Sequence, residues 1–226
     1  MRRKVIPEML DEDVGTAAEV ETSLNDLRHI NDWFGGTRTT VRLLQQVIAH
    51  SKCRDLSLFE VGSGSGHVPL AAQQALRRNG VELRVTLLDR MASHLPASGV
   101  VSVVGDALHL PFCDDAVDVV SCSLFAHHLE PDTLAAFARE ALRVSRRAVL
   151  INDLIRSPLH LALVYAGLPL FRSHITWHDA PASVRRAYTR EEMGSMLREV
   201  SAQRVTIDQY YLYRMGVLLW KAEGSR

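Results

Sequence analysis

The stretch Leu58-Phe-Glu60-Val-Gly62-Ser-Gly64-Ser-Gly66-His67 decides the fold. It is a short apolar run ending in three alternating glycines, which is typical of a buried parallel strand that runs into a tight turn. Glycine lets the backbone turn sharply and approach a ligand at the carboxyl end of the strand. A dinucleotide loop reads G-x-G-x-x-G, but His67 takes the place of its third glycine. The loop therefore predicts another kind of ligand, with an acidic residue two positions before the first glycine.

Strands and helices alternate on either side of this loop. Apolar runs of strand length occupy residues 56–61, 83–88, 100–104, 116–121 and 148–151, with helical stretches at 68–76 and 132–144. This alternation predicts a parallel sheet with helices on both faces. Residues 203–211 and 215–221 are rich in Val, Ile and Tyr, so we expect them to close the sheet as an antiparallel hairpin. The prediction is a three-layer, Rossmann-like α/β fold with a mostly parallel seven-stranded sheet.

The remaining segments divide the chain. Residues 1–50 are expected to form an N-terminal arm and a helical cap, and residues 51–226 the main domain. Residues 1–18 are polar and lack apolar periodicity, so we expect a loose arm. Two helical stretches follow, broken at Gly35-Gly36. A helical, Pro-interrupted insertion at about 153–188 is expected to cover the substrate, and Thr189 with Glu192 predicts a capping box after it.

Composition restricts the partners. The 226 residues include 26 basic and 26 acidic ones, so no basic excess points to nucleic acid, and a small molecule is the expected substrate. Cys53, Cys113 and Cys122 form no CxxC pair, which argues against a disulfide framework or a zinc site and suits the cytoplasm. The most apolar stretch, 159–171, has 13 residues and contains Pro169, whereas a membrane span needs about 20. We expect neither a transmembrane segment nor a signal peptide.

Two more acidic residues follow strands. Asp89 ends the second strand, where a carboxylate can accept both hydroxyls of a ribose. Asp106, in Gly105-Asp-Ala107, follows the third strand and can accept from an adenine amino group. Each alone could be a helix cap or a turn residue. Together with the glycine loop, after three successive strands, they predict one cofactor site.

These residues resemble the class I S-adenosylmethionine (SAM) dependent methyltransferases, most closely the small-molecule branch with the ubiquinone- and menaquinone-type enzymes. Residues 110–120 resemble that branch's LPF-x-DD-x-x-D-V-V signature, and His127-His128-Leu129 resembles its turn after the fourth strand. The resemblance covers about residues 55–152. It implies SAM as cofactor and S-adenosylhomocysteine as product. The cofactor-binding residues implied by loop, acids and resemblance are Glu60, Gly62, Ser63, Gly64, Gly66, Asp89, Arg90, Asp106, Ala107 and Ser123.

The methyl acceptor is expected beyond the carboxyl ends of the fourth and fifth strands. His128, Asp153 and His178 are the predicted catalytic residues, because imidazole titrates near neutrality and a carboxylate can orient it. His127 is an alternative base. Each of these residues could instead have a purely structural role. His128 could hold its turn by hydrogen bonding to the backbone, Asp153 could cap a helix, and His178 could lie in a surface loop.

Two further resemblances suggest substrate-binding residues. The stretch 173–186 resembles the substrate lid of a bacterial subgroup and implies His174 and Asp179. The stretch 31–36 resembles the N-terminal cap of the family and implies Trp33 and Phe34. No metal site is expected, since Asn152-Asp153 reverses the Asp-Asn pair of metal-dependent catechol-type enzymes.

The sequence therefore predicts a SAM-dependent methyltransferase that methylates oxygen or carbon of a small, aromatic or lipophilic metabolite. The alternatives are a catalytically silent SAM-binding regulatory or partner protein, an RNA methyltransferase and, disfavoured by the loop spacing, an NAD(P)-dependent reductase. The acceptor and the oligomeric state stay open at this stage.

Overall fold

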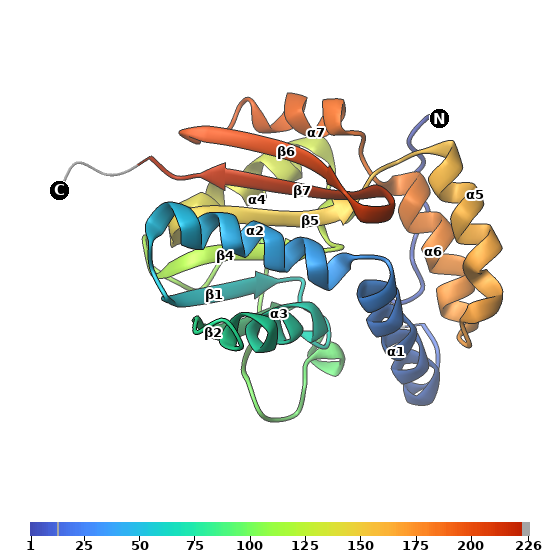
Figure 1. Ribbon diagram of the computed structural model, residues 1–226. Coiled ribbons are helices and arrows are strands. Elements are labelled where there is room, and N and C mark those ends of the chain that lie inside the picture. Colours follow the sequence, from blue (N-terminus) through green and yellow to red (C-terminus); the bar gives the residue numbers. More distant parts are fainter. Residues whose placement is uncertain (13, 223–226) are drawn as a thin grey trace.

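The computed structural model describes residues 1–12 and 14–222, and its centre is one seven-stranded sheet (Figure 1). The strand order is β3-β2-β1-β4-β5-β7-β6. Pairing is parallel from β3 through β5 and antiparallel where β7 lies between β5 and β6. This confirms the predicted fold class. The strands are β1 (Asp55–Val61), β2 (Glu82–Asp89), β3 (Val101–Val104), β4 (Val117–Ser123), β5 (Ser145–Leu154), β6 (Arg204–Tyr210) and β7 (Arg214–Trp220).

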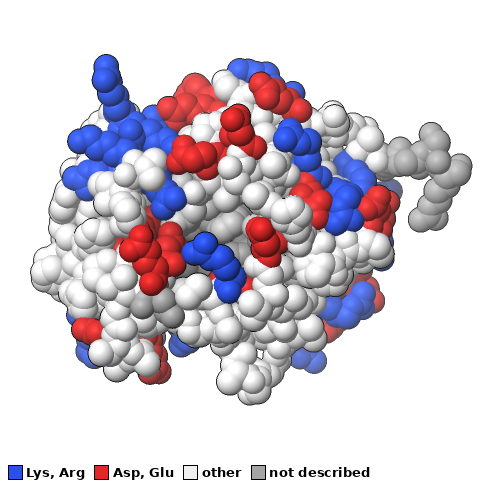
Figure 2. Space-filling view, turned by 180° about the vertical axis from the view of Figure 1, so that it is seen from behind, with Lys and Arg blue, Asp and Glu red and all other residues white. Residues whose placement is uncertain are grey.

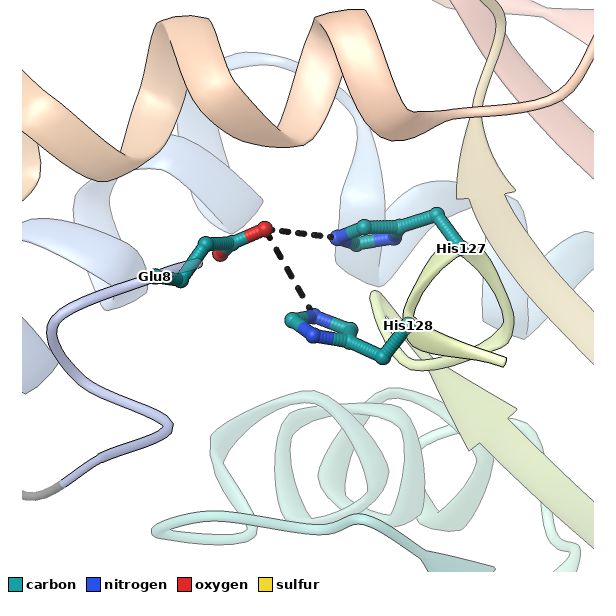
Figure 3. Close-up of side chains that lie close together, drawn as sticks. All are labelled: Glu8, His127 and His128. Atoms are coloured by element: carbon teal, nitrogen blue, oxygen red, sulfur yellow. Dashed lines mark ion pairs between the residues drawn. The ribbon is translucent and has the colours of Figure 1, made fainter. Parts of the chain in front are cut away.

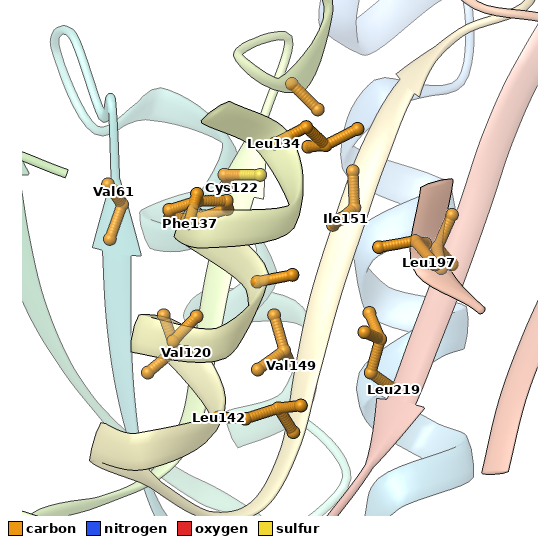
Figure 4. Packing of buried hydrophobic residues seen from close by; sticks show 14 of the residues in the cluster. Val61, Val120, Cys122, Leu134, Phe137, Leu142, Val149, Ile151, Leu197 and Leu219 are labelled. Carbon is orange, nitrogen blue, oxygen red and sulfur yellow. The ribbon is translucent and has the colours of Figure 1, made fainter. Parts of the chain in front are cut away.

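Helices cover both faces of this sheet (Figure 1). Because side chains of a strand alternate between its faces, β1 contributes to two cores. Leu58 packs with Leu44 and Leu76 from helices on one face. Val61 packs with Phe137 on the other face (Figure 4). The first face carries α2 (Gly36–Ser51) and α3 (His67–Arg77), and the second carries α4 (Pro131–Val144) and α7 (Arg190–Leu197).

Three helices stand together beyond the carboxyl ends of the parallel strands (Figure 1). They are α1 (Ala17–Trp33), α5 (Pro158–Gly167) and α6 (His174–Arg186). α5 and α6 make up most of the predicted insertion, and a short 3-10 turn, Leu168–Leu170, joins them. Since ligands of open α/β sheets bind outside the carboxyl ends of the strands, this group lies where a lid is needed.

Local sequence signals mark the helix ends. The Thr189 hydroxyl accepts from the amide of Glu192, and the Glu192 carboxylate accepts from the amide of Thr189, so the predicted capping box is confirmed. Both strands that lead to the acceptor side run further than expected. β4 reaches Ser123 because it pairs with β5 to that residue, and β5 reaches Leu154 because it pairs with β7 to that residue. The division of the chain at residue 50 stays a prediction.

The described residues before α1 are packed against the domain, so the expectation of a loose arm was wrong. The amide of Lys4 donates to the carbonyl of Arg185, and the amides of Met9 and Leu10 donate to the Asp179 carboxylate. Hydrogen bonds to α6 hold this segment, and such bonds leave no apolar periodicity in a sequence. We call the described residues 1–12 the N-terminal arm.

In the described part of the chain, no helix has both the length and the apolar character needed to cross a bilayer.

Candidate active site

The glycine loop follows β1 and keeps its three glycines at positive φ, where other residues are strained. A Cβ atom on Gly62 would lie 2.5 Å from the Phe125 ring, and one on Gly66 would lie 2.4 Å from the Leu87 side chain. A Cβ on Gly64 would meet no atom within 4 Å. Gly62 and Gly66 therefore allow close packing of the loop, whereas Gly64 faces open space.

Glu60 lies directly before this loop, at the end of β1, and is 1% exposed. The Ser121 hydroxyl of the neighbouring strand β4 donates to its carboxylate. Burial raises the pKa of Glu60 to about 6, and the hydroxyls of Ser121 and Ser123 hold it from rising further. A positively charged ligand beside this buried carboxyl group would stabilise its ionised form.

Asp89 and Asp106 follow β2 and β3, side by side at the same edge of the sheet. The amides of Gly64 and Met91 donate to the two carboxylate oxygens of Asp89, at 2.7 and 2.9 Å. Each oxygen has a second lone pair, so both can still accept from a ligand. The amide of Leu108 donates to Asp106 at 2.9 Å and, with His109, lowers the pKa of this carboxyl group. Asp106 is therefore an ionised, exposed acceptor.

These features line one cavity of about 430 Å³, which we call the loop cavity. Nine of the ten residues predicted to bind the cofactor line it, and Gly66 does not. Gly66 instead caps α3 against β2, which explains why a side chain there would collide with Leu87. The loop cavity thus brings together residues from four strand ends.

A second cavity of about 370 Å³, the lid cavity, lies under α1, α5 and α6. Its lining is largely apolar and includes the predicted substrate residues Phe34 and Asp179. The two cavities share five residues, so they meet. The shared residues are Glu8, Leu10, Leu27, Leu124 and Ser183.

Three titratable side chains lie close together beside the loop cavity, and one of them, Glu8, also lines the lid cavity (Figure 3). Glu8 comes from the N-terminal arm, and His127 and His128 come from the 3-10 turn Ala126–His128 after β4. Glu8 Oε1 lies 3.5 Å from His127 Nε2 and 3.9 Å from His128 Nε2. All three residues line the loop cavity. We call Glu8, His127 and His128 the junction cluster.

Carboxylates orient both imidazoles of the junction cluster. Asp153 Oδ1 lies 2.7 Å from His127 Nδ1, and Asp11 Oδ2 lies 2.6 Å from His128 Nδ1. Although burial opposes the charge, Asp153 and then Glu8 raise the pKa of His127 to about 10. His127 also lowers the pKa of Asp153 against the effect of its own burial. Of the predicted catalytic residues, His128 lines the loop cavity, and Asp153 lies behind it, holding His127.

Arg214 is a buried cation at the lid cavity. Its guanidinium donates to Asn31 Oδ1 at 3.0 Å, and its second terminal nitrogen has no hydrogen-bond partner among the described residues. Burial lowers the pKa of Arg214 to about 10, since the charged form lacks solvent. A buried guanidinium with an unpaired N–H group lowers stability unless a ligand oxygen accepts a hydrogen bond from that group.

The structure places three predicted residues away from both cavities. Trp33 is 55% exposed and stacks on His29. The His174 side chain is 58% exposed beside Glu19, and that of His178 is 44% exposed beside Asp179. None of the three lines either cavity.

The sequence reasoning missed the acidic arm residues Glu8 and Asp11 and the buried Arg214. An arginine amid the apolar residues of a closing strand was a usable signal for Arg214, because buried arginine is rare without a partner. The arm offered no such signal, because its contacts join residues far apart in the chain.

Comparisons with known proteins agree with this geometry. Residues 59–151 match the model of a protein family described as "Methyltransferase domain". An uncharacterized methyltransferase of Bacillus subtilis, YcgJ, is 30% identical over 153 residues, which are 64% of this chain and 57% of that protein. The aligned region thus spans less than two thirds of that relative.

Solved structures are similar in fold. A SAM-dependent methyltransferase from Aquifex aeolicus has a TM-score of 0.52 at 16% identity, over 74% of this chain and 82% of that one. The magnesium protoporphyrin IX methyltransferase of Synechocystis PCC 6803, solved with bound S-adenosylhomocysteine, has a TM-score of 0.55 at 16% identity, over 83% and 84%.

The sheet and the matches define a class: the class I, Rossmann-like fold of the SAM-dependent methyltransferases, whose cofactor is SAM. Within this fold, residues 59–151 are the part that matches the family model described as "Methyltransferase domain".

Proposed function

We propose that this protein transfers a methyl group from SAM to oxygen or carbon of a small lipophilic or aromatic molecule. The observation that carries the proposal is that two cavities share lining residues: one around the glycine loop, which is the more polar of the two, and an apolar one under α1, α5 and α6. SAM would occupy the loop cavity and the acceptor the lid cavity. The two reactants would then face each other at the junction cluster.

The residues of the loop cavity fit SAM. Gly64 leaves open space where a side chain would stand, and Glu60 supplies a buried carboxyl group suited to the positive amino-acid end of the ligand. Asp89 would accept from the ribose hydroxyls and Asp106 from the adenine amino group, as the order of these acids after β2 and β3 predicts. Arg90 and Ala107 line the same cavity beside them.

For methyl transfer, the main tasks of the protein are to position the two reactants and to exclude water from between them. SAM supplies an activated methyl group on a positively charged sulfur. An electron pair of the acceptor, a lone pair on oxygen or a π pair at carbon, forms a bond to the methyl carbon while the carbon–sulfur bond breaks. The sulfur keeps the pair of the broken bond in S-adenosylhomocysteine. The acceptor also loses a proton, from its hydroxyl group or from the methylated carbon. The junction cluster is the polar group at this point, so we assign it the task of favouring the deprotonated acceptor.

The lid cavity supports a lipophilic acceptor that carries a polar oxygen. Apolar side chains of α1, α5 and α6 dominate its lining, and Arg214 and His160 are among the polar residues that also line it. The His160 ring nitrogen Nδ1 bonds to the carbonyl of Ile155 at 2.9 Å. Arg214 has an open donor position, which a phenolate, carbonyl or carboxylate oxygen of the acceptor would fill.

Charge supports a small molecule over RNA. On the face in Figure 2, acidic side chains lie among the basic ones, and no basic stripe crosses that face. We further propose that the protein works in the cytoplasm, where Cys53, Cys113 and Cys122, all unpaired, stay reduced.

The test is methyl transfer from SAM with a tritiated methyl group, using a panel of phenols, quinols and aromatic acids as acceptors. We expect label in an extractable small molecule and an equal amount of S-adenosylhomocysteine. Asp89→Ala should weaken SAM binding by about 1–3 kcal/mol, whereas Asp208→Ala, an exposed acid on β6, should not. Label found only in RNA or protein would contradict the proposal. Tight SAM binding without turnover on any extract would favour the silent, regulatory alternative.

A further inference from the structure

The three side chains of the junction cluster are all metal-ligand types, and their ligand atoms lie within 4.8 Å of one another. Glu8 Oε1 is 3.5 Å from His127 Nε2 and 3.9 Å from His128 Nε2. Two ligands that each lie about 2.1 Å from a zinc ion are at most about 4.2 Å apart. We propose that Glu8, His127 and His128 bind one divalent transition-metal ion, such as Zn²⁺.

Two of the three candidate ligand atoms are buried and lack a hydrogen bond. Within the described chain, Glu8 Oε1 and His127 Nε2 face each other only as an ion pair at 3.5 Å. His127 is 2% exposed and Glu8 is 7% exposed. Figure 3 shows the Glu8 carboxylate pointing at both imidazole rings. Buried polar atoms without hydrogen bonds are costly, and one ion between these two atoms would satisfy both.

Each histidine also has the outer partner that a metal ligand needs. Asp153 lies 2.7 Å from Nδ1 of His127, and Asp11 lies 2.6 Å from Nδ1 of His128. Histidines that bind metals generally donate their second ring N–H to such a carboxylate, which fixes the tautomer and turns the other nitrogen to the ion. In both rings of the cluster the nitrogen left for the ion is the Nε2 atom that faces Glu8.

The charge of the surroundings favours a cation. Glu8, Asp11 and Asp153 contribute three carboxylates. Arg186, 3.7 Å from Asp11, and Arg214, which interacts with Asp153, contribute two positive charges. With both imidazoles neutral, as metal ligation requires, one negative charge remains, and it favours a cation at the cluster.

Three protein ligands leave a coordination position open, as in catalytic zinc sites. Glu8 lines both cavities, and both histidines line the loop cavity, so this position faces the place where the reactants would meet. A hydroxyl, phenolate or carboxylate oxygen of the acceptor would bind there, and the ion would favour its deprotonated form. This role rests on the proposed function, but the binding of the ion does not.

The test uses the full chain, stripped with a chelator and titrated with Co²⁺, followed by visible absorption and by competition with Zn²⁺. We expect one ion per chain. Glu8→Gln and His128→Gln should weaken binding by at least about 100-fold, and Asp11→Asn by about 10- to 100-fold, since outer carboxylates have effects of that size. Neither SAM nor an acceptor is present, so the result is independent of the proposed function.

The matched control is Glu19→Gln, which removes the carboxylate beside the exposed His174 and should leave binding unchanged. Circular dichroism checks that each variant folds. Co²⁺ should also raise the melting temperature of the unaltered chain but not that of Glu8→Gln. An unaltered chain that binds no stoichiometric ion would overturn the proposal, and so would Glu8→Gln protein that binds Co²⁺ as tightly as the unaltered chain.

Discussion

Glu60 is a carboxyl group that the fold keeps almost fully buried beside two serine hydroxyls. Its pKa is raised from 4.5 to about 6, so the folded state holds the proton more tightly than the unfolded chain does. The stability gained from that proton is complete below about pH 4.5 and is lost as the pH rises through about 6. At neutral pH the buried, ionised Glu60 therefore lowers the stability of the fold. A role in ligand binding would explain why the protein has a carboxyl group at this position.

We expect Glu60→Gln to raise the free energy of unfolding at pH 7 by about 2 kcal/mol, because the shift of roughly one and a half pKa units disappears. The same variant should bind SAM more weakly. In the unaltered protein a cationic ligand favours ionised Glu60, so SAM affinity should rise by about tenfold between pH 5 and pH 7. Calorimetric titration at several pH values measures this. A pH dependence that persists in Glu60→Gln would contradict the assignment.

The loop glycines offer a second test at the scale of single residues. Gly64 and Gly99 both have positive φ, +50° and +92°, and a Cβ on either would meet nothing within 4 Å. Valine at either position should cost similar stability, about 1–2 kcal/mol or more. Only Gly64→Val should lose SAM binding, because Gly64 lines the loop cavity and Gly99 does not. Equal SAM affinity in the two folded variants would remove Gly64 from the site.

Single residues also show how far sequence reasoning reached. Glu60, Asp89 and Asp106 follow strands in order, so their convergence in one cavity could be predicted from the regular geometry of a parallel sheet. The partnership of His127 with Glu8 could not, since no local periodicity links the arm to a turn after β4. Trp33 was predicted from a resemblance and His178 from the chemistry of imidazole, and the side chains of both lie outside the two cavities.

At the scale of elements, the strands and most helices were predictable, because the 2.0 and 3.6 residue periods of buried positions survive in the sequence. The arm and α6 behave differently. Asp179 holds the arm by accepting from the amides of Met9 and Leu10, at 2.9 and 3.0 Å. This contact lies next to Glu8, to whose carboxylate the Ser183 hydroxyl of the same helix donates at 2.9 Å, so α6 holds this part of the N-terminal arm through both residues.

We expect Asp179→Ala to release the arm while the sheet stays folded. Loss of two charge-assisted hydrogen bonds should speed hydrogen exchange at the amides of Met9 and Leu10 by about tenfold or more. Exchange measured by mass spectrometry on N-terminal peptides reports this directly. His174→Ala, on the same helix but exposed beside Glu19, serves as the control. Unchanged exchange in Asp179→Ala would mean that other contacts hold the arm.

At the scale of the whole molecule, different parts of the fold form the two cavities that we propose for SAM and for the acceptor. The loop cavity lies at the carboxyl edge of the sheet, and the largely apolar lid cavity lies under α1, α5 and α6. Figure 1 shows these three helices beyond the carboxyl ends of the parallel strands. The matched domain, residues 59–151, contains the loop and the histidines but not the arm, α5 or α6. The features proposed to select the acceptor therefore lie largely outside the residues that match the family model.

The most direct test of this account is a crystal structure of the protein with S-adenosylhomocysteine and a lipophilic acceptor found in the tritium assay. We expect the nucleoside in the loop cavity, with its ribose on Asp89, and the sulfur facing the lid cavity across the junction cluster. The acceptor should lie under α5 and α6 with its reacting atom in line with that sulfur. A sulfur turned away from the lid cavity, or an acceptor bound elsewhere, would contradict it.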